Sequence, residues 1–330
     1  MKTYSYHELN PLIRLKELEL LTPDMFDRLV AAKDLKEVQQ LLNSTFYGEF
    51  LQGDFAETFE ESLQNSFNQL ITELIELAPE PEVIWIYTMR FTYHNLKALM
   101  KAELLEQNFD ELFLYDGFYS LEQIKSVVKT GQSNSLPDEI IGTVNAVKAH
   151  FSESNSLQGI DIIFDRDFLR NQEIVGEKLG YVALLSEITA FIDFTNLIIL
   201  GRGIRQKRSK AFLSTVLSSQ GSIAKEDLLA IIEQPQTFAD FILASPYGNE
   251  AASAVVDGKV DLAKLEKAKD DYLASLFEAY QVEAFGPLPM LALLHGKETE
   301  IKNLRLLVVG KKIGMDQSDI KERMRVTHDA

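Results

Sequence analysis

Apolar residues recur at helical spacing along most of this sequence, and this pattern limits the fold more than any other feature. The segment 59–77 places seven large apolar residues on one helical face and stops before Pro79 and Pro81. Helix starts are also marked, because Thr22 precedes a proline and Ser120 stands three residues before Gln123 in a capping box. We find scarce strand signals and no hairpin with two paired strands. The sequence therefore predicts an all-α protein.

Three segments share a second pattern, in which Asn-Leu is followed by an apolar run. They begin at Asn95, Asn196 and Asn303, which are 101 and 107 residues apart. Seven positions after each asparagine stands a small residue: Ala102, Gly203 and Gly310. The spacing predicts three similar helical subdomains in a pseudo-threefold arrangement. Their approximate limits are 1–90 with the C-terminal end, 91–190 and 191–330. The alternative is that helical sequences of similar composition align by chance.

The asparagines themselves have two interpretations. In the first, each one caps or ties helices within its own subdomain, since a buried amide must be hydrogen-bonded. In the second, the three side chains line one shared inner wall and contact a partner. Asparagine at a helix end usually bonds to nearby backbone, so the first interpretation is favoured, and the second stays open.

Charge limits the choice of partner. The chain of 330 residues has a net charge of −17, which repels a phosphate backbone and argues against nucleic-acid binding. Residues 37–89 contain no Lys or Arg, whereas residues 202–210 contain five cations and no acid. Such asymmetry is typical of a surface that meets a protein of opposite charge. The alternative for the acidic segment is a solvated face.

Motifs for catalysis are missing. The chain has no cysteine, so thiolate metal sites, disulfides and a Cys nucleophile are excluded. Gly201 and Gly203 lack the third glycine of a dinucleotide site, and Gly310-Lys311 lacks the upstream glycine of a P-loop. No two histidines have the spacing of metal ligands on a helix. We therefore expect no catalytic site, no metal, no cofactor and no small-molecule substrate.

One window, residues 179–201, is apolar enough to suggest a membrane span. Glu187 and Asp193 interrupt it, and a carboxylate near the centre of a bilayer is costly. We interpret the window as a buried helix pair and expect no membrane-spanning segment. The first twenty residues have no basic start followed by an apolar core, so we identify no signal peptide.

Four segments carry a resemblance to a known family. FIDFTNLIILGRGIRQKR (191–208) and the segment 284–324 resemble the C subunit of prokaryotic V/A-type ATPases, called the d subunit in the eukaryotic enzyme. Residues 14–42 and 90–105 resemble its other helical segments. The most specific part runs from Glu300 through Asn303-Leu304-Arg305 to Gly310-Lys311. The sequence departs from its own repeat at Thr92, where the other two copies have Asp193 and Glu300.

The resemblance implies a funnel-shaped, all-helical, non-catalytic rotor component at the cytoplasmic face of the membrane. Such a component joins the central stalk to the membrane proteolipid ring and transmits torque between ATP hydrolysis, or ATP synthesis, and proton or sodium transport. The ion is then selected by the ring. We expect partner contacts at eight residues: Asn95, Asn196, Arg202, Arg205, Arg208, Asn303, Arg305 and Lys311. The alternatives are a free-standing helical adaptor and a carboxylate-based helical-bundle enzyme.

Overall fold

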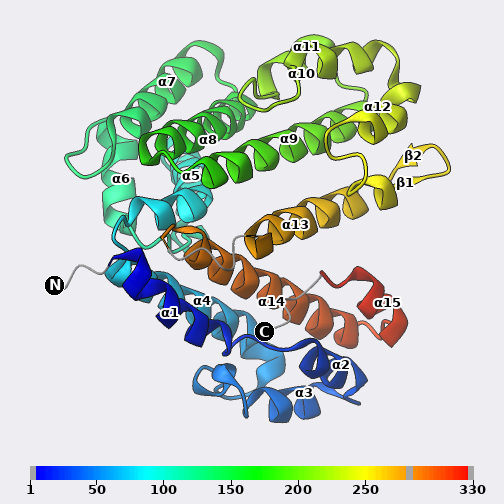
Figure 1. The fold of residues 1–330 in the computed structure, drawn as a ribbon. Coiled ribbons are helices and arrows are strands. Elements are labelled where there is room, and N and C mark those ends of the chain that lie inside the picture. The colour runs from blue at the N-terminus through cyan, green and yellow to red at the C-terminus, as the bar shows by residue number, and fades with distance from the viewer. Residues whose placement is uncertain (1–4, 280–284, 326–330) are drawn as a thin grey trace. The chain divides into compact units, whose positions relative to one another are not determined.

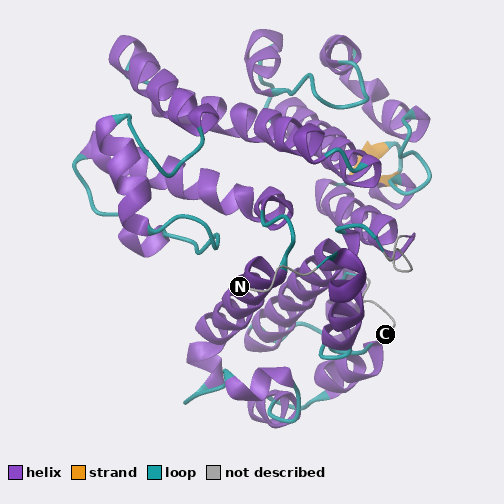
Figure 2. Cartoon of the chain, turned by 60° about the vertical axis from the view of Figure 1, so that its left-hand side comes forward, coloured by secondary structure: helices purple, strands orange, loops and turns teal. Residues whose placement is uncertain are grey.

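The computed structural model describes residues 5–279 and 285–325. These ranges contain fifteen α-helices, several short 3-10 turns and one hairpin of two short antiparallel strands. Figure 2 shows how completely helices account for the described chain. The all-α prediction is confirmed.

The chain divides into two compact units. The terminal unit comprises residues 1–84 and 270–330, and the central unit comprises residues 85–269. Both ends of the chain therefore build one unit. Helices α5 (Glu82–Leu105) and α13 (Leu262–Ala279) contain the points where the chain passes from one unit to the other. The funnel shape, the pseudo-threefold arrangement and the three subdomain limits stay predictions.

The terminal unit is built around α14, which packs against α1 and α4 (Figure 1). Short helices α2 and α3 follow α1, and α15 packs against α2. The elements of this unit are α1 (Tyr6–Glu17), α2 (Pro23–Ala31), α3 (Leu35–Leu42), η1 (Phe46–Glu49), α4 (Phe55–Leu77), α14 (Leu288–Lys312) and α15 (Gln317–Arg323).

The central unit packs α7 on α8 and α8 on α9, and short helices follow α9. Its further elements are η2 (Asp110–Leu112), α6 (Leu121–Thr130), α7 (Asp138–Ser154), α8 (Leu157–Leu179), α9 (Val182–Arg205), α10 (Lys210–Val216), α11 (Lys225–Ala230), η3 (Ile231–Glu233), η4 (Pro235–Thr237), α12 (Phe238–Ala244), η5 (Ala252–Ala254), β1 (Val255–Val256) and β2 (Lys259–Val260).

Local signals explain where the helices begin and end. The Asp54 side chain accepts a hydrogen bond from the amide of Ala56 at the start of α4, and α4 ends just before Ala78-Pro79. The predicted caps are present at Thr22 and Ser120, and Ser120 forms the full capping box. Burying one large apolar side chain on such a helix stabilises it by about 1.5–3 kcal/mol, so the apolar face of α4 holds the helix in place.

The apolar window 179–201 is not a helix pair. It contains the last residue of α8, the left-handed Gly180 with φ 74°, and then most of α9 as one continuous helix. Within the described residues α9 alone is long and apolar enough to cross a membrane, and half of its most apolar window is buried inside the protein. Burial of this kind is typical of a core helix.

The hairpin is an element that the sequence did not predict. β1 and β2 pair antiparallel through Asp257 and Gly258, whose φ angles are 51° and 69°. Two consecutive positive φ angles are characteristic of the type I′ turn, for which Asp-Gly is a preferred sequence. Each strand has only two residues, too few to show alternation in the sequence.

Candidate functional site

Each of the three asparagines holds a later piece of chain with two hydrogen bonds. Asn95 Nδ2 donates to the carbonyl of Leu114 at 2.7 Å, and the Leu114 amide donates to Asn95 Oδ1 at 2.8 Å. Asn196 makes the same pair with Ser218 at 3.0 and 2.9 Å. All three asparagines have 0% exposure. We call this arrangement the asparagine clamp.

The third clamp lies in the terminal unit. Asn303 donates to the carbonyl of Arg325 at 3.1 Å and accepts from its amide at 2.9 Å. The clamped residue follows the asparagine by 22 positions in α9 and α14 and by 19 in α5. Only an amide side chain offers both a donor and an acceptor in this geometry, so Asp or Leu at these positions would lose one or both bonds.

These contacts agree with the interpretation in which each asparagine ties elements within its own subdomain. The expected contact of these side chains with a partner stays a prediction. The small residues that follow make the same local fold feasible: a Cβ on Gly203 would lie 2.6 Å from Leu213, and one on Gly310 would lie 3.0 Å from Ile320. The helix that carries Leu213 can therefore approach this closely only against glycine, whereas the contact of Ile320 with position 310 is tight but leaves room for a small shift.

A carboxylate three positions before the asparagine anchors a further segment in α9. Asp193 accepts hydrogen bonds from the Ser222 amide at 3.1 Å, the Ser222 hydroxyl at 2.6 Å and the Ile223 amide at 3.0 Å. The hydroxyl of Tyr247 donates to the same carboxylate at 2.8 Å. We call Asp193, Ser222 and Tyr247 the α9 cluster.

The equivalent carboxylate in α14 is Glu300. It accepts from the Tyr47 hydroxyl at 2.6 Å, from the Lys297 ammonium at 2.8 Å and from the amide of Leu21. We call Tyr47, Lys297 and Glu300 the α14 cluster. Burial, and after it the negative charge of Glu300, raises the pKa of the Tyr47 hydroxyl well above its usual value, which keeps the phenol a donor.

In α5 the hydroxyl stands on the helix and the carboxylate on the facing segment, the reverse of the arrangement in α9. Thr92 supplies a hydroxyl, which donates to the buried carboxylate of Asp116 at 2.6 Å. Asp116 in turn accepts from the amides of Phe118 and Tyr119 at 2.8 and 2.9 Å. The departure at Thr92 is thus compensated by an acid on the facing segment. Burial raises the pKa of Asp116, although the hydrogen bond from Thr92 and the backbone amides act against this rise.

The three carboxylates accept hydrogen bonds from backbone amides at equivalent positions, each just before the start of a helix. Asp116 binds the amides just before α6, Asp193 binds those just before α11, and Glu300 binds the amide just before α2. The helix that belongs to α14 is therefore α2, which comes from the other end of the chain. In each case the carboxylate fixes the direction in which the next helix starts.

The two tyrosines of these clusters lie in two separate turns of the same type. Thr45-Phe46-Tyr47-Gly48 and Ser245-Pro246-Tyr247-Gly248 each place a hydroxyl within bonding distance of the tyrosine amide, at 3.2 and 3.3 Å. A Cβ on either glycine would lie 2.4 Å or less from a backbone carbonyl oxygen. The repeated Ser/Thr-x-Tyr-Gly pattern is a sequence signal from which both tyrosines, missed as candidates, could have been found.

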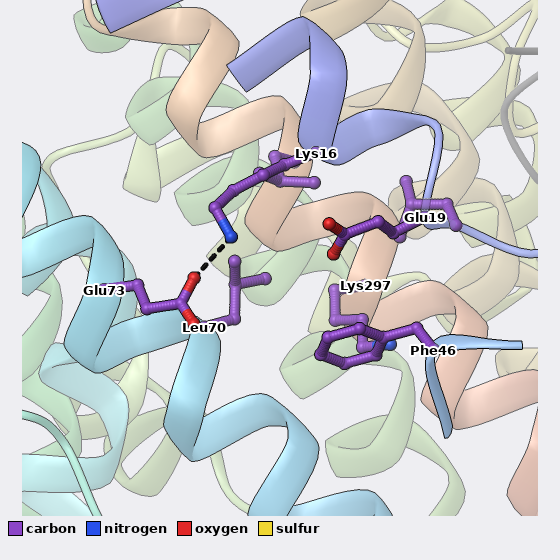
Figure 3. A pocket seen from close by; sticks show the side chains of 8 residues that line it. Lys16, Glu19, Phe46, Leu70, Glu73 and Lys297 are labelled. Carbon is purple, nitrogen blue, oxygen red and sulfur yellow. Dashed lines mark hydrogen bonds and ion pairs between the residues drawn. The ribbon is translucent and has the colours of Figure 1, made fainter. Parts of the chain in front are cut away.

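Lys297 has no charged counterpart in α9, where the equivalent position is Ala190. Its side chain is 4% exposed, and its ammonium lies 3.8 Å from the centre of the Tyr47 ring and 4.5 Å from that of Phe46. Beside it lies a cavity of about 20 Å³, room for one water molecule, which is also lined by Lys16 and Glu73 (Figure 3). Lys16 is paired with Glu73 and Lys297 with Glu300, so both lysines at this cavity have an acid as partner.

Several predicted contact residues are bound within the chain. Arg305 pairs with Glu60 through its Nε at 2.7 and 3.0 Å, and Arg202 pairs with Glu266. The Lys311 ammonium donates to the carbonyls of Val30, at 2.9 Å, and Ala32, which cap the C-terminal end of α2. Burial lowers the pKa of Lys311.

Arg205 and Arg208 differ from these residues. Both are exposed, and Arg208 lies over the ring of Phe212 at 5.0 Å and bonds Gln206 at 3.2 Å. Within the described part of the chain neither arginine makes an ion pair with an acid. Lys207 beside them is exposed as well.

Arg205 lines an open groove of about 780 Å³ at the end of α9. The groove lies against the start of α12, the start of α13 and the β1–β2 hairpin, and we call it the α9 groove. Among the residues described, no group of three His, Cys, Asp or Glu is placed to hold a metal ion. The arrangement as a whole combines buried internal ties with exposed arginines and an open groove.

Comparison with known proteins gives one consistent result. The family model described as "ATP synthase (C/AC39) subunit" matches residues 9–323. The chain is 46% identical to the C subunit of the V-type sodium ATPase of Enterococcus hirae, over 98% of this chain and 99% of that protein. It is 21% identical to the C subunit of the V-type ATP synthase of Thermus thermophilus, over 96% and 97%. It is 20% identical to the C subunit of the A-type ATP synthase of Methanocaldococcus jannaschii, over 96% and 85%.

Proposed function

Because the chain belongs to the family of C/AC39 subunits of ATP synthases, we propose that it is the rotor socket of a V-type ATPase. It is a non-catalytic part of a rotary ATPase. In the proposed role one surface receives the central stalk and another rests on the proteolipid ring, at the cytoplasmic face of the membrane. The observation that carries the proposal is the match of residues 9–323, which covers nearly the whole chain and all three clamping asparagines.

The internal ties suit a part that transmits torque. A coupler must not let its helices slide when one surface is turned against a load. Each clamp fixes a segment by two buried hydrogen bonds, and each carboxylate fixes the start of the next helix. Buried polar bonds of this type are costly to break, because each group would then lack a partner.

The predicted contact residues divide into two proposed roles. We assign direct contact with a partner to the exposed cations Arg202, Arg205 and Arg208, since charged rims steer association. Asn95, Asn196, Asn303, Arg305 and Lys311 act through the chain instead, by holding the elements that present the contact surfaces.

The test is recovery of the tagged chain from membranes of its own organism in mild detergent, with identification of the co-purified proteins. We expect central-stalk and proteolipid proteins in fixed proportion. Recovery of the chain alone, or with proteins outside the ATPase, would favour the free-standing adaptor and overturn the socket. The enzyme alternative is not supported, because the family is non-catalytic.

A further inference from the structure

The α9 groove has a preformed apolar floor. Gly201 lies beneath Phe238 and Leu262, and a Cβ on Gly201 would lie 3.0 Å from the Phe238 ring and 2.5 Å from Leu262. Three elements far apart in the sequence therefore meet at van der Waals distance only because position 201 is glycine. A floor of this kind does not need to be assembled when a ligand arrives.

One wall of the groove is the hairpin. Its Asp-Gly turn, with two positive φ angles, has the tight geometry favoured for a two-residue hairpin. Val256 on this wall is 46% exposed, although most large apolar residues of the central unit are buried. The volume of about 780 Å³ lies in the range of about 300–1,000 Å³ found for ligand pockets. The wall thus presents apolar surface to whatever occupies the groove.

Two cations and two acids line the groove: Arg205, Lys259, Asp257 and Asp261. The Asp261 carboxylate accepts from the amides of Ala263 and Lys264 at 2.9 and 3.2 Å, which holds it at the start of α13. The guanidinium of Arg205 is exposed and makes no ion pair with an acid in the described part of the chain, so it can take a carboxylate from outside.

We propose that the α9 groove binds a protein segment with an apolar side chain followed or preceded by a carboxylate. The apolar side chain occupies the floor beside Val256, and the carboxylate pairs with Arg205. Guanidinium and carboxylate match in a two-bond geometry that lysine cannot reproduce. A net charge of −17 disfavours nucleic acid as the occupant. The proposal rests on the proposed function, because it takes the segment from another protein of the same complex.

The test uses the assembled complex from membranes, with a photo-crosslinking benzoylphenylalanine in place of Val256. We expect a light-dependent adduct with another protein of the complex, mapped by mass spectrometry to a segment that contains an apolar residue and an Asp or Glu. The matched control carries the same group at Val182, which is 79% exposed at the start of α9 in the same unit, and should not label that segment.

A second variant tests the charge. Arg205→Gln combined with the Val256 crosslinker should reduce the adduct about tenfold, the loss expected for one hydrogen-bonded charge pair. Lys129→Gln, which removes an exposed cation from α6, should leave the yield unchanged. A yield that does not respond to Arg205→Gln overturns the pairing.

The outcomes separate this proposal from the socket. Adducts only with lipid, only with a second copy of the chain, or only at the level of the Val182 control overturn the groove proposal, while co-purification with stalk and ring leaves the socket intact. Failure of the unlabelled chain to co-purify with the ATPase overturns the socket itself. Circular dichroism of each variant establishes that it is folded before the crosslinking is compared.

Discussion

The α9 cluster and the α14 cluster solve one problem with different chemistry. Both place a carboxylate three positions before the asparagine of a clamp, and both receive a hydrogen bond from a tyrosine that lies in the same type of turn. In α9 the carboxylate of Asp193 is surrounded by neutral donors: two amides and two hydroxyls. In α14 the carboxylate of Glu300 has one amide, one hydroxyl and the ammonium of Lys297. The α9 counterpart of Lys297 is Ala190, which is buried.

The difference shows how a buried charge can be compensated with or without a counter-ion. Four neutral hydrogen bonds satisfy a carboxylate without adding a second charge to the interior. An ion pair with fewer bonds has to offset the desolvation of both partners, so it depends on each of them. The α14 cluster also joins Leu21 and Tyr47 to a helix near the other chain end, so its loss would weaken a tie between segments from the two ends of the sequence.

The largest effect is expected from Lys297→Met. The variant leaves Glu300 buried with its charge uncompensated, which should lower the free energy of unfolding by about 3–5 kcal/mol in urea titrations. Lys302→Met on the same helix is the matched control. Lys302 is half-buried and pairs with Asp270 at 3.2 Å and Glu298 at 3.3 Å. The buried Asp270 keeps its pair with Arg325 at 2.5 Å, so the loss of Lys302 should cost about 1 kcal/mol or less.

The double variant Lys297→Met/Glu300→Gln tests the cause of that loss. It removes both charges and should regain most of the stability, because the remaining polar group is neutral. A single variant that costs no more than the Lys302 control would mean that Glu300 needs no counter-ion.

The two tyrosines provide the next comparison. Tyr47→Phe and Tyr247→Phe each remove one phenol donor from a buried carboxylate, a loss of about 1.5–3 kcal/mol for a hydrogen bond to a charged group. We expect Tyr47→Phe to cost more, because Asp193 retains three donors and Glu300 retains two. Urea unfolding of both variants checks the order. An equal or larger loss for Tyr247→Phe would contradict the idea that donor number sets the tolerance.

The third comparison concerns the glycines seven positions after Asn196 and Asn303, where we expect smaller losses of stability than in the α9 and α14 clusters. A Cβ on Gly203 would meet three atoms of the buried Leu213 side chain at 2.6–3.2 Å, whereas one on Gly310 would meet Ile320 at 3.0 Å. Gly203→Ala should therefore cost about 1–3 kcal/mol through overpacking. Gly310→Ala should be near neutral, because the better helix propensity of alanine, about 1 kcal/mol, offsets a small shift. Thermal unfolding of the two variants measures the difference, and equal costs would show that the contact distance does not decide it.

Much of the fold, and part of the candidate site, could be predicted from the sequence for physical reasons. Helical periodicity and caps are local, so the all-α class and starts such as Thr22 were evident from the sequence. The clamps were only half visible: the asparagines stand out, but Leu114 and Ser218 contribute backbone atoms that any residue could supply. Lys297 gave no signal, because burial of a lysine depends on which distant aromatic residues enclose it.

The α5 cluster, formed by Thr92 and Asp116, teaches a related lesson. At Thr92 the sequence lacks the acid of the other copies, and the compensating Asp116 lies 24 positions later on the facing segment. An exchange of donor and acceptor across a contact preserves the bond but moves the charge to another place in the sequence. A comparison of only the equivalent positions in the three copies therefore misses the compensating acid.

The last and smallest effect separates the α5 cluster from the other two by its pH dependence. Burial raises the pKa of Asp116 above its ordinary 3.8, so the native state binds a proton more readily than the unfolded chain. The stabilisation from this group is complete below pH 3.8 and is lost as the pH rises through the raised pKa. Asp116→Asn resembles the protonated form and still accepts from the amides of Phe118 and Tyr119, so its stability should lack this slope. Urea unfolding of both proteins between about pH 4 and 8 gives the difference, with Glu153→Gln as an exposed control on α7. The wild type should lose stability relative to Asp116→Asn as the pH rises. A difference that stays constant, or that changes with the opposite sign, would mean that the three hydrogen bonds to Asp116 outweigh its burial and that its carboxyl behaves as a compensated anion.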